Sequence, residues 1–188
     1  PSLRLLDYGT DHVRVLQLGD CARIVAVRGT ADMSDWGHNM VLANGPGYRD
    51  SYGMAETTAR SMAADEHAAR RARTNWTADF AVAGHSQGGF RAIQIGTSMG
   101  ARVFVFNALT AGIAGHKASC ITHYRSRYYG IPDPVSSIAL IYPSRYIARG
   151  HQPTMRHAPS LVEVHSLSNF VDTEQRMRLR ARGVCSST

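Results

Sequence analysis

The chain is almost devoid of lysine and contains little cysteine. Lys117 is the only lysine among 21 Lys and Arg residues, and the net charge is +7 at neutral pH. Codon usage in a GC-rich genome favours arginine in this way; a competing hypothesis is that lysines were lost to avoid ubiquitin in a foreign host cell. The three cysteines, Cys21, Cys120 and Cys185, form no C-x-x-C motif, so we expect separate thiols rather than a metal or redox site.

Long apolar runs are also absent. No stretch of about 18 apolar residues occurs, so the sequence predicts no transmembrane segment. The N-terminus, Pro1–Arg4, lacks both an initiator Met and the apolar core of a signal peptide. Either the chain was trimmed or it is a piece of a longer protein. The sequence does not assign a cellular compartment, and a secreted or effector-like location is compatible with it. Because the 188 residues contain no repeat, low-complexity tract or linker, we expect residues 1–188 to form a single domain.

Short apolar runs alternate with helical segments along much of the chain. Residues 13–18 alternate between apolar and polar side chains, which predicts a half-exposed antiparallel strand. The buried strands are expected at 24–27, 80–83 and 103–106, the helices at 55–73 and 89–99, a further strand at 121–129, and a hairpin at 138–148. Strands that alternate with helices predict an α/β fold, with a mostly parallel central sheet flanked by helices.

The segment Gly84-His85-Ser86-Gln87-Gly88 fits the pattern G-x-S-x-G. An apolar run precedes it and a helical segment follows it, which is the context in which this pattern forms a nucleophile elbow. The sharp turn holds the serine hydroxyl out at the end of the sheet, and the helix N-terminus favours negative charge at that point. Ser86 is therefore the candidate nucleophile.

A serine hydroxyl needs a base to take its proton. In hydrolases with this elbow the partners follow in the order Ser, acid, His, which restricts the search to residues after Ser86. Asp133 lies between two prolines, directly after an expected strand, and is the candidate acid; Glu163 is the weaker alternative. His165 follows an apolar run near the end of the expected domain and is the candidate base.

The other histidines do not indicate a metal site. His151 and His157 lie in a polar, loop-like segment, and together with His116 and His123 they match no metal-ligand spacing. We expect no metal and no cofactor.

An acyl-transfer site also needs two backbone N–H donors that face the developing oxyanion. Gln87, the residue after the nucleophile, is expected to supply one. The other is expected from Arg28-Gly29-Thr30, which follows the strand at 24–27, and the Thr30 hydroxyl adds a donor there.

Several motifs together resemble the class 3 lipases, a family that includes the fungal triacylglycerol lipases. The family shares R-G-[ST], an Asp/Asn-Trp pair, G-F-x-x-S-Y and G-H-S-x-G-G in this order. The chain has Arg28-Gly29-Thr30, Asp35-Trp36, Gly47-Tyr48-Arg49-Asp50-Ser51-Tyr52 and Gly84-His85-Ser86-Gln87-Gly88-Gly89. The resemblance runs from about Val13 to Phe170, and Gln87 replaces the Leu that is common in the family.

The resemblance implies an α/β-hydrolase fold with a catalytic triad of Ser86, Asp133 and His165 and an oxyanion hole of Thr30 and Gln87. It also implies that the segment at about 31–45 is a lid. The stretches around Asp133 and His165 look more like bacterial lipase-like domains, some of which are phospholipases.

The function expected from these observations is that of a serine esterase that degrades lipids: a lipase or phospholipase that cleaves acyl esters and works without a cofactor. The positive charge of the protein favours a lipid substrate that lies in an anionic membrane surface. The alternatives are a small-ester esterase or thioesterase, and a catalytically silent lipid- or partner-binding module. We expect no nucleic-acid partner, because the two-residue spacing of Arg176, Arg178, Arg180 and Arg182 scatters their charges around a helix. The oligomeric state is left open.

Overall fold

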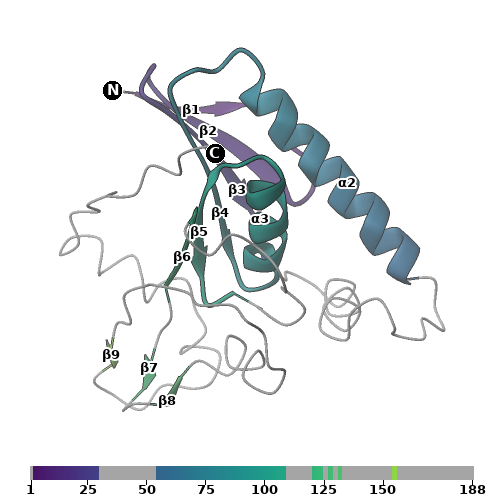
Figure 1. Ribbon diagram of the computed structural model, residues 1–188, viewed down its shortest axis with the longest axis vertical. Helices are drawn as coiled ribbons and strands as arrows, with labels where there is room; N and C mark the ends of the chain where they lie inside the picture. Colours follow the sequence, from purple (N-terminus) through teal and green to yellow (C-terminus); the bar gives the residue numbers. More distant parts are fainter. Residues whose placement is uncertain are drawn as a thin grey trace.

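A six-stranded sheet forms the body of the protein. The computed structural model describes residues 2–29, 54–108, 120–124, 127–128, 131–132 and 154–155. Within these residues the sheet has the strand order β1-β2-β3-β4-β5-β6 (Figure 1). Its strands are β1 (Leu3–Leu6), β2 (Val13–Leu18), β3 (Ala22–Val27), β4 (Asp79–His85), β5 (Arg102–Phe106) and β6 (Ile121–Tyr124).

The sheet is antiparallel at one edge and parallel elsewhere. β1, β2 and β3 pair in antiparallel fashion, whereas β3, β4, β5 and β6 are parallel. The parallel strands are joined through two helices, α2 (Met54–Arg73) between β3 and β4, and α3 (Gln87–Ser98) between β4 and β5. This arrangement belongs to the α/β class that the alternation of strands and helices predicted.

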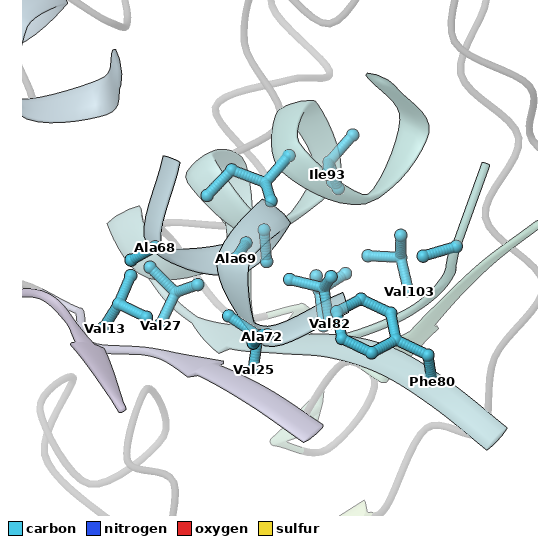
Figure 2. Close-up of a cluster of buried hydrophobic side chains, with 14 of the residues drawn as sticks. Val13, Val25, Val27, Ala68, Ala69, Ala72, Phe80, Val82, Ile93 and Val103 are labelled. Carbon is cyan, nitrogen blue, oxygen red and sulfur yellow. The ribbon is translucent and has the colours of Figure 1, made fainter. Parts of the chain in front are cut away.

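The core lies between the sheet and the two helices, which cover the same face (Figure 1). Alternate residues of the strands point toward the helices, and Val25, Val82 and Val103 are aligned across three neighbouring strands and fully buried. Figure 2 shows that Ala68, Ala69 and Ala72 of α2 pack near Ile93 of α3 above these valines. Small alanine side chains let α2 approach the sheet closely, while each large apolar side chain such as Ile93 contributes about 1.5–3 kcal/mol on burial.

The exposed side of α2 carries two ion pairs. Glu56 pairs with Arg60 at 3.6 Å and Glu66 with Arg70 at 2.6 Å, both at the i,i+4 spacing. Within the described ranges, neither this helix nor α3 combines the length and apolar character needed to cross a membrane.

Several expectations need correction or lie outside the described residues. β1 was not expected from the sequence. The strand expected at 121–129 is divided into β6 and a short strand, β7 (Arg127–Tyr128), which joins β8 (Ile131–Pro132) and β9 (Thr154–Met155) in a separate small sheet of order β8-β7-β9. The hairpin expected at 138–148 lies outside the described residues.

The cysteines differ from the expectation of separate thiols. Cys21 is a free and exposed thiol, as expected. Cys120 is disulfide-bonded, so the expectation is wrong for this residue. Wide spacing in the sequence does not prevent two cysteines from meeting in the folded chain, so the lack of a C-x-x-C motif did not exclude a disulfide.

Candidate active site

Ser86 occupies the turn between β4 and α3 in a backbone conformation that L-residues rarely adopt. Its φ is 57° and its ψ is −126°. Such a conformation costs on the order of 1–3 kcal/mol and persists only where the surroundings hold it. Two backbone hydrogen bonds do so here: the Ser86 N–H donates to the Phe106 carbonyl at 3.1 Å, and the Gly89 N–H donates to the Ser86 carbonyl at 3.0 Å. A serine held in this way between a parallel strand and a helix has the geometry of a nucleophile elbow.

Glycines allow the turn to close. A Cβ at Gly84 would collide with the Gly88 carbonyl, and a Cβ at Gly89 would collide with the Ala108 side chain. Side chains at these two positions would therefore push α3 away from the strand ends. The glycines of the motif serve the packing of the turn as well as its conformation.

The backbone after β3 passes beside Ser86. A Cβ at Gly29 would lie 3.2 Å from the Ser86 Cβ and 2.7 Å from the His85 carbonyl oxygen. Only glycine permits this approach, which agrees with the expectation that the loop after β3 borders the serine. Thr30, the expected donor in this loop, lies outside the described residues.

Gln87 is the first residue of α3. The Ser86 side chain caps no N–H of the helix, and the first N–H groups of any helix lack intrahelical acceptors. The Gln87 N–H therefore belongs to a group of donors at the helix end, next to the Ser86 hydroxyl. The Gln87 side chain is buried, and within the described part of the chain neither its Oε1 nor its Nε2 has a hydrogen-bond partner.

The carboxyl ends of β5 and β6 meet at the same edge of the sheet as Ser86. Phe106 stacks on Tyr124 with their ring centroids 5.0 Å apart, and the Asn107 N–H donates to the Tyr124 carbonyl at 2.8 Å. Burial raises the pKa of the Tyr124 phenol above its ordinary value of 10.0, so the ring is neutral beside the site. This edge of the sheet thus carries an aromatic stack on the strand whose last carbonyl, that of Phe106, accepts the Ser86 N–H.

His123 illustrates why an isolated histidine is a poor indicator of a metal. It is buried on β6, and its Nε2 accepts the Ala108 N–H at 3.1 Å, so this nitrogen supports the loop after β5. Among the residues with described positions, no three His, Cys, Asp or Glu side chains group as metal ligands would.

The structure thus places Ser86 and Gln87 next to each other, with Gly29 against the serine. Asp133, Glu163 and His165, the residues expected to activate the serine, lie outside the described residues, as do His116, His151, His157 and the expected lid at about 31–45. Comparison with protein-family models found no match to the chain, and comparison with curated proteins found none either.

Proposed function

We propose that the chain is a serine carboxylester hydrolase with an α/β-hydrolase fold of the class 3 lipase type, acting on acyl esters of lipids. The observation that carries the proposal is the backbone of Ser86: a positive φ, held by two backbone hydrogen bonds and permitted by close-packed glycines, at a junction of parallel strand and helix. An ordinary turn has no need of a strained serine, whereas a nucleophile elbow requires one.

In the proposed mechanism Ser86 attacks the ester carbonyl while His165 takes its proton as general base. Asp133 accepts a hydrogen bond from His165 and stabilises the charged imidazolium. The negative oxygen of the tetrahedral intermediate is held by the Gln87 N–H and by Thr30 in the loop after β3. His165 then donates its proton to the leaving alcohol, and an acyl-enzyme remains on Ser86.

Water completes the cycle. His165 takes a proton from water as the water oxygen attacks the acyl carbonyl, and the imidazolium then returns this proton to Ser86 Oγ as the bond to the acyl group breaks and the carboxylic acid leaves. The net charge of +7 favours phospholipid over neutral triglyceride as the substrate class, because basic residues attract an anionic membrane surface.

The test compares wild type with Ser86→Ala and with Ser98→Ala, which alters a serine at the far end of the same helix. Wild type and Ser98→Ala are expected to hydrolyse a p-nitrophenyl ester and to be labelled by a fluorophosphonate, and Ser86→Ala to do neither while keeping the circular dichroism spectrum of wild type. Ester turnover by a folded Ser86→Ala protein would contradict the mechanism. Wild type that reacts with neither reagent would favour a silent binding module, and activity on short soluble esters alone would favour an esterase or thioesterase.

A further inference from the structure

A cluster of polar side chains lies inside the protein, between α2, α3 and the loop before β2. Arg91 of α3 and Asp65 of α2 are almost wholly buried, with 0% and 1% of their side chains exposed, and Arg91 Nη1 donates to Asp65 Oδ2 at 2.5 Å. The other members are Thr10, His12 and Ser61. We call these five residues the Asp65 cluster.

The cluster connects three elements. The Thr10 hydroxyl donates to Asp65 Oδ1 at 2.7 Å, and Arg91 Nη1 also donates to the Ser61 hydroxyl at 2.8 Å. Ser61 Oγ lies 3.3 Å from His12 Nδ1. Each element is therefore tied to the other two through the one buried carboxylate and its neighbours.

Stability is a poor explanation for this cluster. Burying a guanidinium and a carboxylate costs several kcal/mol per ion, and an apolar pair of similar volume is often as stable or more so. Hydrogen bonds offset only part of the cost of burying the Arg91 guanidinium, since its Nε and Nη2 have no hydrogen-bond partner within the described part of the chain. A directional ion pair does, however, fix the separation of two elements more narrowly than apolar packing does.

Of the elements that the cluster connects, α3 carries one proposed donor of the oxyanion hole, and the loop before β2 is hydrogen-bonded to the residue that follows β3. Arg91 lies four residues after Gln87, about one helical turn along α3 and on the same side. At the other end, the His12 carbonyl accepts the Arg28 N–H at 2.7 Å, and Arg28 precedes Gly29, whose backbone lies against Ser86. The cluster is thus attached both to the helix that bears Gln87 and to the loop that leads to Thr30.

We infer that Asp65 and Arg91 are positioning residues, which hold the start of α3 and the loop after β3 at the separation that the oxyanion hole requires. The inference rests on the proposed function. Donors of an oxyanion hole must lie within about 2.7–3.1 Å of the oxyanion, and a displacement of about 1 Å can cost about 10²-fold in rate. The ion pair therefore acts on the transition state through the backbone, without touching the substrate.

The test replaces the pair by apolar residues of similar volume, Asp65→Leu with Arg91→Met. The double variant is expected to keep a melting temperature close to that of wild type, because no buried charge is left alone. Its kcat for a p-nitrophenyl ester is expected to fall about 10- to 100-fold with KM within about twofold, since a loss confined to the transition state lowers kcat and kcat/KM together. The matched control is Glu56→Leu with Arg60→Met, which removes an exposed pair from α2 and is expected to leave kcat unchanged.

Two further variants keep the inference testable if the double variant does not fold. Because Arg91 makes both of its described contacts through Nη1, Arg91→Lys can retain a charged donor toward Asp65 and is expected to recover most of the kcat that Arg91→Met loses. A wild-type kcat in the folded double variant, or equal kcat in folded Arg91→Lys and Arg91→Met, overturns the inference and leaves the proposed function standing. A wild-type protein that neither hydrolyses esters nor reacts with a fluorophosphonate overturns both.

Discussion

The backbone of Gly88 lies directly against the carbonyl of Val27. A Cβ at Gly88 would collide with this oxygen and with the carbonyl of the next residue, Arg28. The first turn of α3 therefore rests on the end of β3 through main-chain contact, with no side chain between them. This contact brings the turn that holds Ser86 next to the loop that follows β3.

Gly88→Ala is expected to displace α3 and to reduce the reaction of Ser86 with a fluorophosphonate. The colliding atoms are backbone and cannot rotate away, and overpacking of this kind costs typically about 1–3 kcal/mol or more. Gly100→Ala is the control, because Gly100 has φ +62 but nothing within 4 Å of an added Cβ. It should cost about 1–2 kcal/mol in unfolding free energy and leave labelling unchanged. Equal labelling of folded Gly88→Ala and wild type would show that the contact is dispensable.

Asp133→Asn is expected to lower ester turnover by about 10⁴-fold, the loss seen when an asparagine replaces the acid of a well-defined triad. An asparagine cannot stabilise the imidazolium and favours the wrong histidine tautomer. Glu163→Gln, which alters the alternative acid, should retain turnover. If Glu163→Gln is inactive and Asp133→Asn is nearly normal, the acid has been assigned to the wrong residue.

The link between Glu66 and Arg70 predicts a measurable effect of acid. A hydrogen bond from Arg70 is the main cause that lowers the pKa of the Glu66 carboxyl below its ordinary value of 4.5, and Ser98 of α3 adds a second hydrogen bond in the same direction. Since the folded state favours the carboxylate, Glu66 stabilises the protein above the unfolded pKa, and this contribution disappears as the pH falls through the lower, folded pKa. The effect is modest, because both partners are more than a third exposed.

Melting temperatures between about pH 6 and about pH 3 would measure this contribution. The melting temperature of Glu66→Gln is expected to fall less steeply with acid than that of wild type, and the two curves should converge at the acidic end. Added salt should reduce the difference near neutrality, because salt screens an exposed pair. Parallel curves would show that Glu66 adds nothing that depends on its charge.

Salt should distinguish a membrane substrate from a soluble one. With a net charge of +7, the protein is expected to bind anionic vesicles more tightly than neutral ones, each basic residue near the surface contributing about 1 kcal/mol. The attraction is screened over about 8 Å at physiological salt, so hydrolysis of anionic phospholipid vesicles should fall as salt rises. Hydrolysis of a short soluble ester should not. The same salt dependence for both substrates would remove the reason to prefer phospholipid.

The elements that were predicted best are those marked by a pattern of apolar and polar residues within their own sequence. The alternation of residues 13–18 matched β2 over its full length, because Val13 and Val15 face the core while Arg14 faces away. The run at 80–83 located β4 but not its ends, since pairing with β3 and β5 extends the strand to Asp79 and His85. β1 was missed because its four residues become a strand only by pairing with β2, where Leu5 is opposite Leu16.

The same distinction applies to the site. The turn at Ser86 was predictable, because a short motif in a strand–helix context carries its own conformation, and Ser86 has the unusual φ that the motif demands. The Asp65–Arg91 pair was not, because it forms only when α2 packs against α3 and no spacing in the sequence joins residues 26 positions apart. One signal was available: Arg91 interrupts a buried segment that includes Phe90 and Ala92, and a charge in such a place needs a partner.

The six-stranded sheet keeps the order of the chain, since each strand lies beside those that precede and follow it. As the sheet forms, each strand can therefore pair with the strand that precedes it in the chain, and no late strand has to be inserted between two earlier ones. The turn at Ser86 needs nothing beyond Phe106 for the backbone bond that holds its N–H. In the proposed enzyme the backbone bonds that hold the nucleophile thus come from residues that precede both Asp133 and His165 in the chain, so the shape of the serine turn and its activation depend on separate parts of the sequence.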